Sequence, residues 1–315
     1  MTHLPPEHSS HDTEHHHHPY HEELVTVRDW LRYMVSLFNR KGISFGHGCE
    51  NAFDEALWLL FHTLDIPREH SDIFLDASIL EEEKNHLLDI IDQRVNQRVP
   101  TAYLTHEAWM NDFRFYVDER ALIPRSFFGE FLEDSLTPWV TDAPKITEVL
   151  DLCTGSGCLA ILLAHAFYNA HTVAADISAD ALAVAARNIS DYGLEQKIEL
   201  VQSDLFSALT GRKFDIIISN PPYVTAESMQ QLPAEYRHEP VTALAGGDDG
   251  LDIVRSILQQ AAAFLKPGGL LAIEIGHNRA AVEQNFPHYP FIWLSSSVSD
   301  DMIFILRAED LGASA

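Results

Sequence analysis

The chain has 315 residues, 46 % of them hydrophobic, and can therefore bury one large core or two of ordinary size. It carries 21 Lys and Arg against 47 Asp and Glu, a net charge of −26 with His neutral. So acidic a surface repels a phosphate backbone, which argues against direct nucleic-acid binding. It attracts basic partners, including basic proteins.

The three cysteines, Cys49, Cys153 and Cys158, form no Cys-x-x-Cys pair. They favour a reducing compartment over a disulfide framework or a cysteine-based zinc site, and we expect no structural metal. No apolar run approaches the roughly 20 residues that cross a bilayer. The N-terminus lacks the basic and apolar parts of a signal peptide. We therefore expect a soluble, cytoplasmic protein without membrane association.

Residues 1–22 are polar and rich in His and Pro, which predicts a disordered tail. The run His15–His18 can bind a transition metal weakly, but a solvated tail or an appended tag is the simpler interpretation.

Residues 23–104 are predicted to form a small helical domain with a role in substrate recognition. The stretch VRDWLRYMVSLFNR has apolar residues three to four apart, and NAFDEALWLLFHTLDIP repeats the pattern up to Pro67. EEEKNHLLDIIDQRV opens with acids, which favour the first turn of a helix. We interpret the large side chains on the first helix as core and not as cofactor contacts: Val27, Trp30, Met34 and Phe38.

Residues 105–122 are predicted to be a β-hairpin linker that turns at Asn111–Asp112. From Ile123 to Ala315 the chain alternates strands and helices, with strands in ITEVLDL, HTVAAD, IELVQS, KFDIIIS, GLLAIEIG, FIWLSSS and MIFILR. Only Val298–Asp301 separates the last two strands, so they must be antiparallel. The pattern predicts an α/β, Rossmann-like seven-stranded sheet with an antiparallel strand at one edge.

The first strand of this sheet runs into DLCTGSGCLA. Gly155 and Gly157 fall at a strand-to-helix turn, where the backbone approaches a ligand closely and helix N–H groups point at it. Asp176 ends the second strand, 19 residues after Gly157, and an acid there can accept both ribose hydroxyls of a nucleoside.

The glycine loop alone is ambiguous, because residues 155–160 also fit the GxGxxA pattern of dinucleotide-binding proteins. Asp151 would repel a pyrophosphate but can hold a cationic methionine amino group. The antiparallel final strand is also typical of methyltransferases. Asp204 can meet an adenine amino group, with Leu205 or Phe206 near the ring, although Asp204 can instead be a helix N-cap.

The fourth strand ends in Asn220-Pro221-Pro222-Tyr223. Ligands of open α/β sheets bind beyond the carboxyl ends of the strands, so this tetrapeptide should face the cofactor. An amide nitrogen becomes a nucleophile when acceptors for both of its N–H bonds aim its lone pair. Asn220 offers a side-chain oxygen, Pro221 a backbone carbonyl on a rigid loop, and Tyr223 can cover the planar amide.

Together these motifs resemble the protein-glutamine methyltransferases of the HemK type, over roughly residues 23–315. DLCTGSG, Asp176, SDLF and the Asn-Pro-Pro-Tyr motif carry the resemblance, and YLTHEAWMNDFRFYVDERALIPR and YRHEPVTALAGGDDGLDIV are similar to flanking segments of that family. It implies a class I methyltransferase domain with S-adenosylmethionine as cofactor. It also implies that Asn220 and the Pro221 carbonyl hold the acceptor glutamine, and that the cofactor is bound by Cys153, Thr154, Gly155, Ser156, Gly157, Asp176 and Leu205. We expect Asn220 to border the cofactor as well.

The family has one branch that modifies peptide-chain release factors and another that modifies the third protein of the large ribosomal subunit. Release-factor enzymes usually continue Ile-Pro-Arg with Pro-Glu-Thr-Glu. Here Ser126-Phe127-Phe128-Gly129-Glu130 follows Arg125, which resembles the ribosomal branch, as do EYRHEP and GGDDGLD. Leu205 stands where the release-factor branch often has Trp. The resemblance implies a large-subunit ribosomal protein as partner. Arg125 can brace the substrate loop or form a surface salt bridge.

Three other functions remain open from the sequence. Amino-methyltransferases of nucleic acids also use Asn-Pro-Pro-Tyr, although the charge and the lack of a basic recognition domain oppose that function. A nicotinamide dehydrogenase would need a catalytic His, Lys or Tyr pair, which is not evident beside the loop. A non-catalytic binding module would require Asn-Pro-Pro-Tyr to be incidental.

Overall fold

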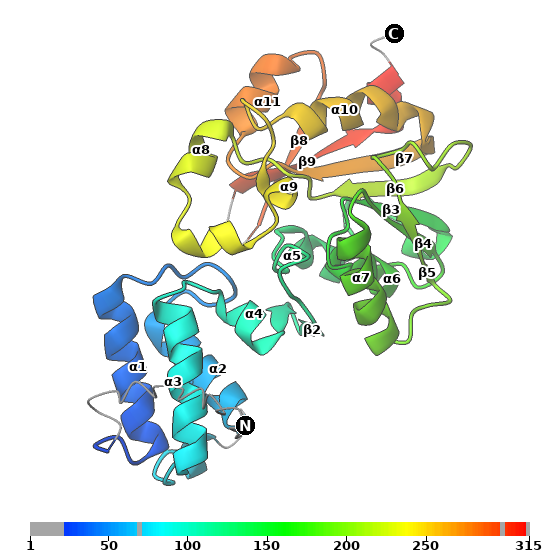
Figure 1. Ribbon diagram of the computed structural model, residues 1–315. Coiled ribbons are helices and arrows are strands. Elements are labelled where there is room, and N and C mark those ends of the chain that lie inside the picture. The colour runs from blue at the N-terminus through cyan, green and yellow to red at the C-terminus, as the bar shows by residue number, and fades with distance from the viewer. Residues whose placement is uncertain (1–21, 68–70, 297–299, 313–315) are drawn as a thin grey trace, which may run out of the picture.

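The computed structural model describes residues 22–67, 71–296 and 300–312. Figure 1 shows a helical region at the lower left and a sheet with helices on both faces at the upper right. The predicted disordered tail, with His15–His18, lies outside the described residues except for Glu22. Among the described helices, none has the length and apolar character needed to cross a membrane.

The helical region contains α1 (Val27–Lys41), α2 (Ala52–Thr63), the 3₁₀ helix η1 (Ser71–Phe74), α3 (Glu81–Val95) and α4 (Thr101–Thr105). Thr26 and Asp29 form a capping box at the start of α1, and Gly42 ends the helix with φ 58°. The four residues interpreted as core are 0–2 % exposed, which confirms that interpretation: Val27, Trp30, Met34 and Phe38. Helix α2 ends at Thr63, before Pro67, because Asp65 already has φ 51°.

The predicted hairpin is present as β1 (Ala108–Met110) paired antiparallel with β2 (Phe113–Phe115). Asn111 has φ 53° at the turn, a conformation that Asn tolerates better than most residues. The division into a helical domain at 23–104, a linker at 105–122 and a methyltransferase domain at 123–315 stays a prediction.

Seven strands form one sheet in the order β5-β4-β3-β6-β7-β9-β8, as the sequence predicts in number and type. Strands β3 to β7 are parallel, and β9 is antiparallel to β7 and β8. Their bounds are β3 (Glu148–Leu152), β4 (His171–Asp176), β5 (Ile198–Gln202), β6 (Phe214–Ser219), β7 (Leu265–Glu274), β8 (Ile292–Ser295) and β9 (Asp300–Arg307).

The antiparallel strand differs from expectation in one respect, since β9 lies between β7 and β8 and not at the edge. Residues 303–306 of β9 are all buried, as a strand covered on both faces requires, whereas β8 has only Leu294 buried. The more apolar strand therefore takes the interior position.

Helices cover both faces of the sheet (Figure 1). On one face lie α5 (Phe128–Glu133), α6 (Cys158–Ala166) and α7 (Ala179–Asp191), and on the other α10 (Asp252–Gln260), α11 (Arg279–Asn285) and α12 (Ala308–Leu311). Successive residues of a strand point to opposite faces of the sheet. Val149 therefore packs in the first core, beneath α5, α6 and α7, and Leu150 in the second core, beneath α10, α11 and α12. The remaining short helices are η2 (Ala143–Lys145), α8 (Ala226–Gln231), η3 (Ala234–His238), α9 (Val241–Leu244) and η4 (Ala261–Ala263).

Candidate active site

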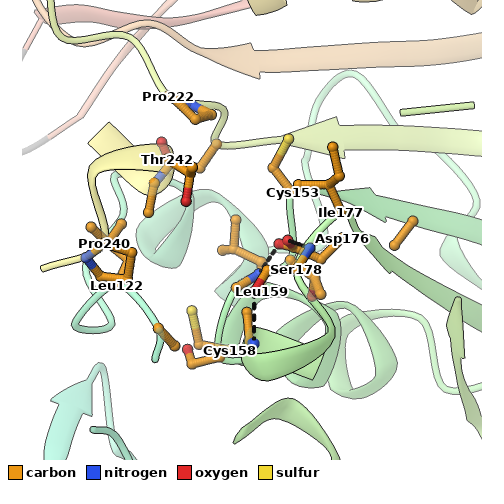
Figure 2. A pocket seen from close by; sticks show the side chains of 18 of the residues that line it. Leu122, Cys153, Cys158, Leu159, Asp176, Ile177, Ser178, Pro222, Pro240 and Thr242 are labelled. Carbon is orange, nitrogen blue, oxygen red and sulfur yellow. Dashed lines mark hydrogen bonds between the residues drawn. The ribbon is translucent and has the colours of Figure 1, made fainter. Parts of the chain in front are cut away.

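A cavity, here the first cavity, lies where β3, β4, β5 and β6 end. Its empty volume, open mouth included, is about 1030 Å³, the size of a site for a small organic ligand. In Figure 2, Leu122, Pro240 and Thr242 lie on one side of it, and Cys153, Asp176 and Ile177 on the other. Residues 120–126, here the inter-domain segment, and the chain after β6 thus form the wall opposite the strand ends.

The loop after β3 is shaped by backbone conformations that favour glycine. Gly155 has φ 55° and Gly157 φ 81°, and Cys153 also has a positive φ of 61°. A Cβ built on Gly155 meets none of the described atoms within 4 Å, and Gly155 lines the first cavity, so the space beside this backbone is open to a ligand. A Cβ on Gly157 would come within 3.0 Å of the Ala185 Cβ. The absence of a side chain at Gly157 therefore lets α6 and α7 pack closely.

Asp176 lies at the end of β4 and lines the first cavity. Its carboxylate accepts hydrogen bonds from the Gly155 and Ser178 backbone N–H groups, each at 2.9 Å. Burial raises the pKa of Asp176, against the lowering effect of these bonds. The carboxylate therefore fixes the glycine loop and also presents its oxygens to the first cavity.

Asp151 occupies a different place from the one expected of a direct ligand. It is fully buried, accepts a 2.5 Å hydrogen bond from Thr154 Oγ1, and is absent from the lining of the first cavity. Burial raises its pKa to about 7. Its Oδ1 has no hydrogen-bond partner among the described residues, and a free acceptor of this kind suits a neighbouring cation. The role of Asp151 toward an amino group stays a prediction.

The other predicted residues of the cofactor site line the first cavity, with the exception of Gly157: Cys153, Thr154, Gly155, Ser156, Asp204, Leu205 and Asn220. The alternative of Asp204 as a helix N-cap is wrong, because no helix follows it and residues 205–208 form turns. Leu205 has φ 45° and packs at the edge of the second core. Leu122, Thr242 and Ile253 also line the first cavity; they lie within the two flanking segments that resemble the family, but no chemistry had singled them out.

A second cavity adjoins the first and is lined by Pro221, Tyr223, Val224, Leu232, Tyr236 and Leu244. Leu122, Arg125, Asn220 and Ala243 line both cavities. Asn220 Nδ2 donates a 3.3 Å hydrogen bond to the Arg125 carbonyl, and Oδ1 is thereby the atom left to accept from a ligand. Pro222 lines the first cavity, so the Asn-Pro-Pro-Tyr loop contributes to both.

Arg125 is held by a carboxylate that the sequence did not single out. Its guanidinium donates to both oxygens of Glu239, at 2.6 and 2.8 Å. The Glu239 side chain is fully buried and also contacts His47 Nε2 at 3.3 Å and accepts from the Ile123 N–H at 3.1 Å. The alternative of a surface salt bridge is therefore wrong. Glu239 lies in the EYRHEP stretch and in the longer segment 236–254, both noted for their resemblance, but no role had been given to it.

The EYRHEP stretch, residues 235–240, also contacts the helical region through Glu235. Its Oε1 accepts from the Ser44 N–H and lies 3.4 Å from Arg94 and 3.2 Å from Arg98. Glu235 is only 2 % exposed. The helical region is thus attached to the chain that follows Asn-Pro-Pro-Tyr and borders the second cavity.

We expect Glu239→Gln to lower the free energy of unfolding by about 3 kcal/mol at pH 7, because it leaves the Arg125 cation without its buried counter-charge. Burial raises the pKa of Glu239, but the hydrogen bonds and charges of His47 and Arg125 outweigh it and lower the pKa to about 2, from an ordinary 4.5. A lowered pKa stabilises the fold above about pH 4.5, and this contribution is lost as pH falls towards 2. Urea unfolding of both proteins between pH 3 and 7 measures the difference.

Glu227→Gln, at an exposed position on α8, is the matched control and should change little. A wild-type advantage below about 1 kcal/mol at pH 7, or one that does not shrink in acid, would contradict the assigned role of Glu239.

Comparison with known proteins agrees with the architecture. A family model described as "Methyltransferase small domain" matches residues 136–235, from before β3 into η3. A curated relative from Neisseria gonorrhoeae is 52 % identical over 290 residues, 92 % of this chain and 97 % of the relative. Relatives from Burkholderia pseudomallei (51 % over 297 residues, 92 % and 97 % covered) and Bradyrhizobium diazoefficiens (45 % over 295 residues, 92 % of each) are similar along the same extent.

The strand order, the glycine loop and these matches make the chain an S-adenosylmethionine-dependent methyltransferase of class I, with a seven-stranded Rossmann-like sheet and an N-terminal helical region. All three relatives are named ribosomal protein uL3 glutamine methyltransferase. The chain belongs to that family.

Proposed function

We propose that this protein transfers a methyl group from S-adenosylmethionine to the side-chain amide nitrogen of a glutamine in ribosomal protein uL3. The observation that carries the proposal is the place of Asn220, which lines both cavities and directs its Nδ2 to the Arg125 carbonyl. The names of relatives that align with 92 % of the chain support uL3 as the substrate.

The second cavity suits a planar amide. Asn220 Oδ1 and the Pro221 carbonyl accept the two N–H bonds of the acceptor, and Tyr223 covers its face. Bound S-adenosylmethionine supplies an electrophilic methyl group on a positively charged sulfur. Asn220 Oδ1 and the Pro221 carbonyl would hold the amide nitrogen with its lone pair directed at that methyl group, and one amide proton would leave to solvent. The chain contributes positioning and fixed dipoles.

The first cavity suits the methyl donor. We assign Asp176 to the ribose hydroxyls, Asp204 and Leu205 to the adenine, and residues 153–157 to the remainder, with Asp151 beneath the loop near the amino group. The open space beside Gly155 and the two carboxylates in the lining, Asp176 and Asp204, support this assignment.

Substrate selection requires a surface beyond the second cavity, since every exposed glutamine offers the same amide. We assign it to the helical domain at 23–104, which Glu235 and Glu239 attach beside the second cavity. Ribosomal proteins are made and assembled in the cytoplasm, and we propose that the enzyme acts there. Arg125 is assigned to positioning the substrate loop through Asn220.

Mass spectrometry of purified uL3, after incubation with the enzyme and S-adenosylmethionine, tests the proposal. We expect a gain of one methyl group on one glutamine of uL3, and far less on a release factor or on duplex DNA. Equal methylation of the release factor would favour the other branch of the family. Methylation of DNA alone would favour the nucleic-acid enzymes.

We expect kcat/KM for free uL3 to fall steeply as salt rises from about 50 to 300 mM. The net charge of −26 attracts a basic protein, and exposed charges are screened beyond about 8 Å at physiological ionic strength. Initial rates at fixed, saturating S-adenosylmethionine measure the effect. The full chain is used, because truncation before residue 123 would leave Glu235 without its Arg94 and Arg98 partners. Rates independent of salt would remove electrostatic steering from the account.

A further inference from the structure

Glu274, the last residue of β7, is a buried carboxylate to which the mechanism above gives no role. Only 2 % of it is exposed. Its Oε2 accepts hydrogen bonds from Ser126 Oγ at 2.6 Å and from the Phe127 N–H at 3.0 Å, and its Oε1 accepts from the Tyr223 hydroxyl at 3.2 Å. One carboxylate thus joins three chain segments: β7, the inter-domain segment and the Asn-Pro-Pro-Tyr loop.

The bond to Glu274 completes the placement of the Tyr223 ring. A Cβ on Gly276 would come within 2.7 Å of Tyr223 Cε2, so the ring packs directly on the backbone after β7. The Asn278 amide donates to the Tyr223 carbonyl at 2.8 Å. Backbone, ring face and hydroxyl are therefore each fixed by a separate contact, and the ring they fix lines the second cavity.

The bonds to Ser126 and Phe127 act on the opposite wall. These residues directly follow Arg125, whose carbonyl accepts from Asn220 Nδ2. Glu239 holds the start of the segment at Ile123 and Arg125, and Glu274 holds its end. Two buried carboxylates therefore fix residues 123–127 between them, and with that segment the orientation of the Asn220 amide.

We propose, on the basis of the function above, that Glu274 is a positioning residue for methyl transfer, whose ionised carboxylate holds Tyr223 and residues 123–127 at the spacing that aligns the acceptor amide. The carboxylate accepts hydrogen bonds from all three partners, and a glutamine side chain would have to reverse at least one of them at a hydroxyl group. Glutamine offers one acceptor oxygen and turns an N–H group towards donors.

The ionised form is costly to bury, and burial raises the pKa of Glu274 to about 7 despite its three hydrogen bonds. The titratable or charged groups of the described chain that act on it are the Tyr223 hydroxyl and the Arg125 guanidinium. Because its pKa is higher in the folded protein than in the unfolded chain, Glu274 lowers the free energy of unfolding as pH rises from about 4.5 towards 7. Glu274→Gln should therefore be at least as stable as the wild type at pH 8, while its catalytic site is less well aligned.

The test compares wild type, Glu274→Gln, Tyr223→Phe and the double variant on uL3 at pH 8, with Glu283→Gln on the exposed side of α11 as control. We expect Glu274→Gln to lower kcat by about 10- to 100-fold, with S-adenosylmethionine affinity within twofold and an unchanged or higher Tm. The wild-type to Glu274→Gln rate ratio should shrink as pH falls from 8 to 6. The double variant should lose less than the two single losses combined, because Tyr223 and Glu274 are in direct contact.

A kcat for Glu274→Gln within threefold of the wild type, or additive losses in the double variant, would overturn the role of Glu274. So would a kcat that falls together with Tm and cofactor affinity, because that pattern marks a structural residue. Failure of the wild type itself to methylate uL3 would overturn the proposed function, and the positioning role with it.

Discussion

Asn220→Ala should reduce the rate of methyl transfer by roughly 100-fold or more, the scale of losing one preorganised polar group from an active site. S-adenosylmethionine affinity should stay nearly unchanged. Asn220 Nδ2 is bonded to the Arg125 carbonyl, so the side chain is already oriented before an acceptor arrives. Alanine removes both the acceptor oxygen and the bond that orients it. Single-turnover kinetics at saturating cofactor, with calorimetry for cofactor affinity, separate the two effects.

Asn169→Ala is the matched control. Asn169 is exposed and donates to the Pro144 carbonyl, away from both cavities, and its loss should leave the rate unchanged. A variant at Asn220 that keeps more than a third of the turnover rate would remove Asn220 from the acceptor site.

Asp176→Ala should weaken S-adenosylmethionine binding by about 1.5–3 kcal/mol, or roughly 10- to 150-fold in Kd, through loss of charge-assisted hydrogen bonds. Two causes act together. The carboxylate lines the first cavity, and it also accepts from the Gly155 N–H that shapes the glycine loop. Isothermal titration calorimetry of the purified variant measures the change.

Asp180→Ala removes the same charge from an exposed position on the first turn of α7 and controls for the change in net charge. The loss should be confined to the Asp176 variant. If both variants bound the cofactor as the wild type does, Asp176 would have no part in the cofactor site.

The sequence predicted the sheet well because strand periodicity and connection length are local properties. The link of four residues at Val298–Asp301 was enough to require an antiparallel pair, which β8 and β9 form. The sequence pattern could not show that β9 lies between β7 and β8, because strand order depends on which strand is covered on both faces. Helix α2 ends before Pro67 because Asp65 has a positive φ. No residue pattern in the sequence predicts that conformation.

The parts of the candidate site that lie in recognisable motifs were predicted from the sequence. The residues of the glycine loop, Asp176 and the Asn-Pro-Pro-Tyr loop converge on the two cavities, although Asp151 lies beneath the loop and outside the lining. No role was predicted for Glu239, although it lies in the EYRHEP stretch, or for Glu274, a single acid in an apolar strand. What makes them notable is burial against partners more than 100 positions away, Arg125 for the first and Ser126 for the second.

The buried Arg94 has two counter-ions of different origin. Glu55 belongs to the same helical region, 39 residues earlier, whereas Glu235 is 141 residues later. During synthesis the N-terminal part emerges first, and domains generally fold as they emerge. With Glu55 already present, the helical region can bury its arginine without waiting for the remainder of the chain. The arrival of Glu235 would then complete the second ion pair and join the helical region to the later part of the chain.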